Sequence, residues 1–245
     1  ALRSDVEQMS HMSGHNLQVY AGMIASLDRS IGKIIEKLKD LNIYGKTMII
    51  FTSDNGGANY IELKDINKPF RGWKISFFEG GIRVPFIVSW PDKISPGLTS
   101  NSAVHHFDIF PTIVSATKIT TSNKKELDGV NLLPYIKKEN SDEPHETLFW
   151  RSGNHQSVLH KKWKYIVSKK ENKSWLFDTS IDPLEKNNLI ESHPKEAQKI
   201  EELLVQFNSE QKEPLFPSAF EAPIMIDKYD GQTYEEGDDY IYWSN

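Results

Sequence analysis

A short polar segment carries the side chains best suited to bind an ion. Asp54 and Asn55 stand side by side and are followed by Gly56 and Gly57. A carboxylate and an amide oxygen on a glycine-supported turn are the hard oxygen ligands that Ca²⁺ and Mg²⁺ take in proteins. The same residue types also form ordinary turns, in which the Asp or Asn side chain accepts a backbone hydrogen bond. The segment alone leaves both interpretations open.

A lysine farther along the same polar stretch adds a positive charge. Lys74 ends the segment Arg71-Gly72-Trp73-Lys74, and the stretch closes on Glu79-Gly80-Gly81-Ile82-Arg83. Beside a metal site, a lysine ammonium binds an anionic substrate as a point charge and stabilises negative charge on a leaving oxygen. The alternative is a solvated loop lysine, with Glu79 and Arg83 pairing to brace the loop.

One helix and two apolar strands should position these side chains. Residues 19–41 carry apolar side chains at intervals of three and four, which predicts an amphipathic helix. Residues 47–52 form an apolar run typical of a strand covered on both faces, and residues 84–90 predict a second apolar strand. The polar loop 53–81 leaves the carboxyl end of the first strand, where α/β sheets bind ligands. These patterns predict an α/β layer architecture.

The later part of the chain has a different pattern. Short β-type runs predict an antiparallel meander, and Pro194 opens a helix to residue 208. The runs are residues 147–152, 156–159, 162–168 and 174–178. The tail has no clear period, but its aromatic side chains predict that it wraps the body of the protein. A boundary near residue 140 then separates an α/β part, 1–140, from a sheet-plus-helix part with the wrapping tail, 141–245.

Composition excludes several classes of protein. The 34 acidic and 29 basic residues give a net charge of −5, which argues against a nucleic-acid partner. No apolar run approaches the ~18–20 residues of a bilayer span, so we expect no membrane partner. With no cysteine, the chain lacks disulfides, zinc–thiolate sites and a cysteine nucleophile. It opens on Ala1 with no signal peptide and reads like the middle of a longer polypeptide.

The order of motifs along the chain resembles that of the type I sulfatases, which are formylglycine-dependent members of the alkaline-phosphatase superfamily. Matching segments extend from Tyr20 to the helix that follows Pro194. They include Ser53-Asp54-Asn55-Gly56-Gly57, Arg71-Gly72-Trp73-Lys74, Glu79-Gly80-Gly81-Ile82-Arg83-Val84-Pro85, Phe107-Asp108-Ile109-Phe110-Pro111-Thr112, Leu127-Asp128-Gly129-Val130, Lys162-Trp163-Lys164-Tyr165 and Asp182-Pro183 with Glu185-Lys186-Asn187-Asn188-Leu189. The resemblance implies part of an alkaline-phosphatase-like α/β sandwich domain, followed by a smaller α+β subdomain with an antiparallel sheet and a helix.

The resemblance also implies roles for individual residues. Asp54 and Asn55 match the two late metal ligands of the family, and Ca²⁺ is expected in preference to Mg²⁺. Lys74 matches the lysine that contacts the substrate sulfate and helps to stabilise the leaving group. The first hairpin of the family's C-terminal subdomain borders the substrate cleft. Arg151, Asn154 and His155 are therefore candidates for sugar contact, with hairpin packing as the alternative.

Part of the family's active site lies outside this sequence. The nucleophile of the family is a formylglycine made in a Cys/Ser-x-Pro-x-Arg motif, which this sequence does not contain. The nearest segment, Ser89-Trp90-Pro91-Asp92-Lys93, ends in lysine and follows the second strand. We therefore expect a carboxyl-terminal half that is inactive by itself. The formylglycine is expected in an amino-terminal half, supplied by the same or another chain.

The resemblance implies a sulfatase, a hydrolase of sulfuric esters, acting on a sulfated carbohydrate. Two alternatives remain open: a phosphate or phosphonate ester hydrolase of the same superfamily, and a non-catalytic remnant that binds sulfated glycans. A single Asp-Asn pair without a nearby histidine favours sulfate over phosphate. By family, the expected location is the periplasm or outside the cell.

Overall fold

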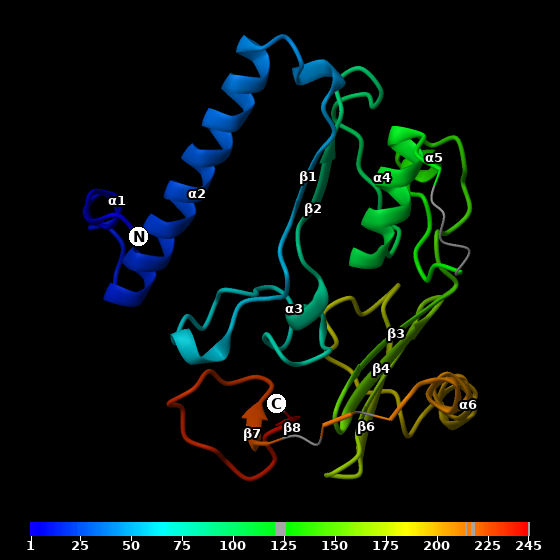
Figure 1. The fold of residues 1–245 in the computed structure, drawn as a ribbon. Helices are drawn as coiled ribbons and strands as arrows, with labels where there is room; N and C mark the ends of the chain where they lie inside the picture. Colours follow the sequence, from blue (N-terminus) through cyan, green and yellow to red (C-terminus); the bar gives the residue numbers. More distant parts are fainter. Residues whose placement is uncertain (121–125, 214, 217–218, 245) are drawn as a thin grey trace. The chain divides into compact units, whose positions relative to one another are not determined.

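The computed structural model describes residues 1–120, 126–213, 215–216 and 219–244. Over these ranges the chain combines helices with a four-stranded sheet and two two-stranded sheets (Figure 1). No helix within the described ranges is both long enough and apolar enough to cross a bilayer.

The helix and the two strands predicted in the first part of the chain are present. The helix is α2 (His15–Asp40), and the strands β1 (Ile49–Thr52) and β2 (Phe86–Ser89) pair with each other. The loop between the strands ends in α3 (Glu79–Ile82), a helical turn that the sequence did not predict. The other elements here are α1 (Arg3–Gln8), η1 (Tyr44–Lys46), η2 (Asn59–Ile61), η3 (His106–Asp108), α4 (Ile109–Thr117) and α5 (Leu133–Ile136).

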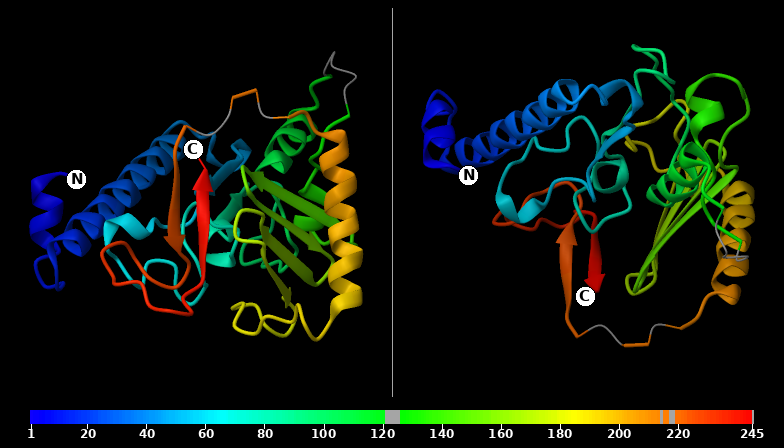
Figure 2. Two further views of the ribbon diagram at one scale, coloured as in Figure 1. Left: turned by 90° about the horizontal axis from the view of Figure 1, so that it is seen from below. Right: turned by 45° about the horizontal axis from the view of Figure 1, so that its top comes forward.

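The predicted meander forms a four-stranded antiparallel sheet with one face against a helix. Its strands are β3 (Thr147–Ser152), β4 (His155–His160), β5 (Trp163–Ser168) and β6 (Lys173–Asp178), in that order. Helix α6 (Pro194–Glu210) lies along the sheet (Figure 2). Its apolar side chains at intervals of three and four, among them Ile200 and Leu204, pack on Val158 and Leu176 of the strands. This periodicity is what the sequence displayed.

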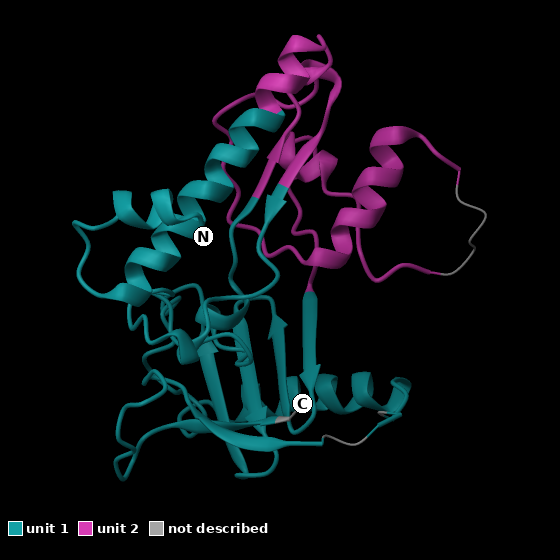
Figure 3. Ribbon diagram, turned by 60° about the vertical axis from the view of Figure 1, so that its left-hand side comes forward, with its two compact units in different colours: residues 1–34, 51–86, 147–245 teal, residues 35–50, 87–146 magenta. Residues whose placement is uncertain are grey.

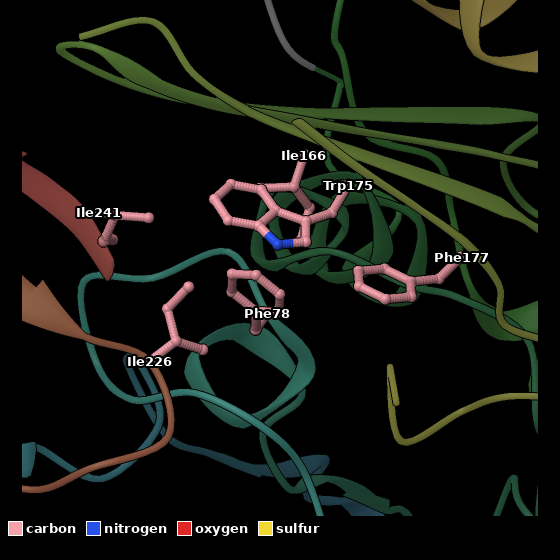
Figure 4. Packing of buried hydrophobic residues seen from close by; sticks show 6 residues of the cluster. All are labelled: Phe78, Ile166, Trp175, Phe177, Ile226 and Ile241. Carbon is pink, nitrogen blue, oxygen red and sulfur yellow. The ribbon is translucent and has the colours of Figure 1, made fainter. Parts of the chain in front are cut away.

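The opposite face of the sheet packs on the residue that precedes α3. Side chains alternate between the faces of a strand, so Ile166 and Trp175 point away from α6 and pack against Phe78 (Figure 4). Phe78 is fully buried, which contributes roughly 1.5–3 kcal/mol relative to an exposed ring. Ile226 and Ile241 of the tail complete this core cluster. The sheet therefore holds the end of the polar loop.

The tail contains a hairpin that the sequence did not predict. Strands β7 (Glu221–Met225) and β8 (Tyr240–Ser244) pair antiparallel, with Ile224 opposite Ile241. The sequence of β8 shows no alternation of apolar and polar side chains, because aromatic side chains fall on both faces of the strand. A wrapping tail was expected from its composition alone, and the ordered pairing comes from packing on the core cluster.

The chain divides into two compact units (Figure 3). One consists of Ala1–Ile34, Phe51–Phe86 and Thr147–Asn245, and the other of Ile35–Ile50 and Ile87–Glu146. The chain passes from one unit to the other at Thr147, near the boundary predicted at residue 140. As a division into domains, 1–140 and 141–245 stay a prediction. All the predicted site residues belong to the first unit.

Candidate active site

The turn that carries Asp54 and Asn55 packs directly on α3. The Gly56 N–H donates to the Gly81 carbonyl oxygen at 2.9 Å. A Cβ on Gly56 would overlap the carbonyl oxygen of Gly80, so only glycine allows the two backbones to approach this closely. The double glycines that were candidate turn residues therefore form the contact between the metal-binding candidates and α3.

Lys74 returns to the same turn. Its backbone N–H donates to the Gly57 carbonyl oxygen at 2.9 Å. The Asn67 side chain ties the two segments together again, because it accepts from the Gly57 N–H at 2.7 Å and donates to the Gly72 carbonyl at 3.1 Å. The structure thus brings Lys74 beside the Asp54 turn. Asn67 was not predicted from the sequence, since nothing in its local pattern distinguishes it from other loop asparagines.

The Lys74 side chain is half-buried, and no acidic side chain of the described residues pairs with it. Its neighbours in the sequence differ in this respect. Arg71 forms a bidentate pair with Asp227, at 2.8 and 2.6 Å, and Arg83 pairs with Glu79 at 3.3 Å. A half-buried ammonium without a carboxylate partner is suited to bind an anion that comes from solution.

Asp54 and Asn55 have the donor chemistry of a calcium site but supply only part of one. The exposed Asp54 carboxylate accepts the Asn55 N–H at 3.0 Å, and Ser53 Oγ donates to the Asn55 carbonyl at 2.9 Å. These contacts form a local turn and leave further oxygen lone pairs open. Ca²⁺ takes six to eight oxygen ligands. Within the described part of the chain, no three His, Asp or Glu side chains gather into a metal group, so the calcium site stays a prediction.

An ion-paired cluster lies under α3. The Lys164 ammonium lies 2.6 Å from a Glu79 carboxylate oxygen and 2.7 Å from one of Glu185, and Lys164 and Glu185 are fully buried. Burial opposes the charged form of Lys164, but the two carboxylates outweigh it and raise the lysine pKa. Burial likewise acts to raise the pKa of Glu79, but Lys164 and Arg83 lower it overall, whereas burial keeps the pKa of Glu185 raised. The cluster therefore holds a charged lysine.

The strand register could have indicated the role of Lys164. Positions 164, 166 and 168 alternate with the apolar positions that face α6, so a lysine at 164 must point into the other core. Glu185 offered no such signal, because it lies in a loop. Both residues were noted only as members of the motifs that resemble the sulfatases.

The three candidates for sugar contact form contacts within the protein. The His155 ring is buried, stacks on Phe77 at a centroid distance of 4.7 Å, and accepts the Phe77 N–H at its Nε2 atom, 3.1 Å away. Arg151 donates to the Lys212 carbonyl at 2.9 Å, and Asn154 donates to Glu221 at 3.0 Å. These contacts agree with the hairpin-packing alternative. A role in sugar binding stays a prediction, and for His155 the buried ring argues against it.

The fold places the chain in the class of alkaline-phosphatase-like α/β proteins, as predicted. It is similar to the crystal structure of Ps i-CgsB, with 26% sequence identity and a TM-score of 0.79, over 88% of this chain and 48% of that chain. A further structure of Ps i-CgsB is in complex with k-i-k-neocarrahexaose. The phosphonate monoester hydrolase of Agrobacterium radiobacter shares the fold at 23% identity and a TM-score of 0.60, over 78% of this chain and 41% of that one.

The sequence comparisons define the family within this class. Residues 3–119 match the sulfatase family, and residues 72–213 match the C-terminal region of N-sulphoglucosamine sulphohydrolase. Human N-acetylgalactosamine-6-sulfatase is 38% identical over 119 residues, which are 48% of this chain and 23% of that protein. The chain belongs to the sulfatase family. It spans about a quarter of this human relative and about half of Ps i-CgsB.

The close contact between the Asp54 turn and α3 predicts how a substitution of Gly56 changes the stability of the protein. We expect Gly56→Ala to destabilise the protein by about 1–3 kcal/mol, because the new methyl group must displace backbone. Gly32→Ala in α2 is the matched control, since a Cβ there meets nothing within 4 Å and alanine favours a helix by ~0.5–1 kcal/mol. Urea unfolding of both variants measures the difference. Equal stability of the two variants would contradict the close approach.

Proposed function

We propose that this chain forms the sulfate-binding side of a sulfatase that hydrolyses a sulfate ester of a carbohydrate. The observation that carries the proposal is the half-buried Lys74, which has no carboxylate partner among the described residues and is hydrogen-bonded through its backbone to the Asp54 turn. Membership of the sulfatase family supports sulfate as the anion. The complex of Ps i-CgsB with an oligosaccharide supports a carbohydrate as the carrier.

Each residue of the proposed site has a distinct task. Asp54 and Asn55 would hold Ca²⁺, and the bound ion would neutralise negative charge on the sulfate oxygens. The Lys74 ammonium would bind the sulfate as a point charge and stabilise the negative charge that develops on the leaving oxygen. The nucleophile, a formylglycine in the family, is not encoded in this sequence. We therefore propose that residues 1–245 are inactive alone and need an amino-terminal half.

The calcium part of the proposal predicts the effect of one substitution. In the sulfatase that contains these residues, Asp54→Ala should weaken Ca²⁺ binding by at least tenfold, which corresponds to ~1.4 kcal/mol. The reason is that the variant lacks the charged oxygen ligand. Titration calorimetry after treatment with a chelator measures the affinity. Asp28→Ala, which removes an exposed carboxylate of α2, should leave the affinity unchanged. Equal affinity in the two variants would rule Asp54 out as a ligand.

The activity itself is tested on the protein isolated from its natural source. Its intact mass under denaturing conditions and a peptide map would identify any residues before Ala1, including a Cys/Ser-x-Pro-x-Arg peptide. Hydrolysis of 4-nitrophenyl sulfate is then compared with hydrolysis of 4-nitrophenyl phosphate and a phosphonate monoester. We expect preference for the sulfate ester in the larger protein and no turnover by residues 1–245 alone.

Two results would favour the alternatives. Preference for the phosphate or phosphonate ester would contradict the proposal and favour a phosphate or phosphonate ester hydrolase. A phosphonate monoester hydrolase has the same fold. Retention on an immobilised sulfated polysaccharide without any turnover would favour a non-catalytic remnant.

We also propose a location in the periplasm or outside the cell, which fractionation of the source cells tests.

A further inference from the structure

A buried carboxylate reaches the first residue of α3 from the far end of the chain. Glu185, in the loop between β6 and α6, is fully buried. One of its oxygens accepts the backbone N–H of Glu79 at 2.6 Å, and the other lies 2.7 Å from the Lys164 ammonium. Lys164 in turn contacts the side chain of Glu79 at 2.6 Å. Glu185 therefore holds α3 both directly and through Lys164.

The backbone of Glu185 is also unusual. Its φ is 55°, in the left-handed region that non-glycine residues seldom adopt. Its carbonyl oxygen accepts a long hydrogen bond from the Arg71 guanidinium at 3.4 Å. A buried carboxylate is unfavourable unless it is paired and hydrogen-bonded. An unfavourable backbone conformation and a buried carboxylate occur together in Glu185, whose carboxylate contacts Glu79 and Lys164 and whose carbonyl oxygen contacts Arg71.

Hydrogen bonds hold the segment that contains Lys74 against α3. The Gly80 N–H donates to the Arg71 carbonyl at 2.6 Å, which closes the segment between them into a loop. Inside this loop, the buried Ser76 hydroxyl accepts the Trp73 N–H at 3.1 Å and donates to the Trp73 carbonyl at 2.8 Å. Lys74 lies within this internally bonded turn. The segment that contains Lys74 is therefore tied to α3, so a displacement of α3 should also displace the Lys74 side chain.

We propose that Glu185 is a positioning residue for the sulfate-binding Lys74 and acts through its hydrogen bond to the first residue of α3. The inference rests on the proposed function, in which Lys74 binds the sulfate group. Glu185 has no role in contacting the substrate. It determines the position of the Lys74 ammonium, because its hydrogen bond to the Glu79 N–H fixes one end of the segment from Arg71 to Glu79.

Protection of Lys74 from chemical modification tests the proposal. Inorganic sulfate is titrated into the protein during brief reductive methylation, and modification at Lys74 is read by peptide mass spectrometry, with sodium chloride at matched ionic strength as the reference. Glu185→Met and Glu185→Gln are matched in size and leave Glu79 to neutralise Lys164. Only glutamine offers an oxygen to the Glu79 N–H.

We expect sulfate to protect Lys74 in the wild type. In Glu185→Met, half-protection should need about tenfold more sulfate, whereas Glu185→Gln should stay within about threefold of the wild type. Glu185→Asp provides a second test that keeps the charge; its shorter side chain should weaken protection several-fold. Asp108→Asn is the stability control, because it removes a buried carboxylate of the other compact unit and should leave protection unchanged. Thermal melts verify that each variant folds.

The possible failures are distinguishable. If sulfate protects Lys74 equally in the wild type, Glu185→Met and Glu185→Asp, the positioning role is wrong and the proposed function stands. Loss of protection in Asp108→Asn equal to that in Glu185→Met would make the effect one of general stability and would also reject the role. If sulfate does not protect Lys74 even in the wild type, the proposed function itself fails, and the inference fails with it.

Discussion

Lys164→Met should destabilise the protein by about 3–5 kcal/mol at neutral pH, because it leaves two carboxylates without their shared buried cation. Lys164 is fully buried between Glu79 and Glu185, at 2.6 and 2.7 Å. Its hydrocarbon stem is replaced by methionine with little change in volume, so the loss is chiefly electrostatic. Urea unfolding followed by circular dichroism measures the free energy of unfolding.

Two further variants isolate the electrostatic cause. Lys162→Met removes the lysine two residues away, whose side chain is 52% exposed and pairs with Asp178. We expect a smaller loss than for Lys164→Met, because the Lys162 side chain is half in water and Asp178 keeps its hydrogen bonds from Ser180. Adding Glu185→Gln to Lys164→Met removes one unpaired charge and should recover part of the lost stability. A loss below about 1 kcal/mol in Lys164→Met would show that the cluster is not buried as described.

Acidification should destabilise the protein through His155. Burial lowers the pKa of this imidazole from its ordinary 6.5 to about 3. As the pH falls below 6.5, His155 becomes protonated in the unfolded chain but stays neutral in the folded protein. The stability that the neutral ring provides is thus complete above pH 6.5 and decreases by ~1.4 kcal/mol per pH unit towards pH 3. At pH 4.5 about 3 kcal/mol of it should be lost.

A variant at the same position separates this effect from the titration of carboxylates. His155→Gln offers an oxygen to the Phe77 N–H, which the histidine Nε2 accepts at 3.1 Å, but it does not titrate. The pH dependence of its unfolding free energy between pH 7.5 and 4.5 should be about 3 kcal/mol shallower than that of the wild type. His11→Gln, at an exposed position, should keep the wild-type dependence. Parallel curves for the wild type and His155→Gln would show that His155 is not buried neutral.

Local periodicity in the sequence determined most of the regular elements. Helices α2 and α6 were predicted because intervals of three and four place apolar side chains on one face. The strands β3–β6 were predicted because short apolar runs alternate with turns. The order of motifs was enough to identify the sulfatase family. The predicted bounds differ from the observed ones at the ends of the elements, where terminal turns depend on neighbours rather than on pattern.

Tertiary structure decided how the candidate site is held. The sequence singled out Asp54, Asn55 and Lys74, but only folding brings the Gly57 carbonyl to the Lys74 N–H and places the turn on α3. The prediction of sugar contact by His155 rested on its place in a hairpin, and the structure buries the ring. The tail hairpin was missed because its pairing follows from burial of Ile226 and Ile241 in the core.

The ion-paired residues under α3 could not be predicted from the sequence for a physical reason. Lys164 and Glu79 are 85 positions apart, and Glu79 and Glu185 are 106 apart. A lysine or glutamate has the same local pattern whether it is solvated or buried, since its partner is set by the fold and not by its sequence neighbours. The sequence therefore determined which elements form and which family they belong to. The contacts between distant elements, which set the charges and the position of Lys74, were decided only when the chain folded.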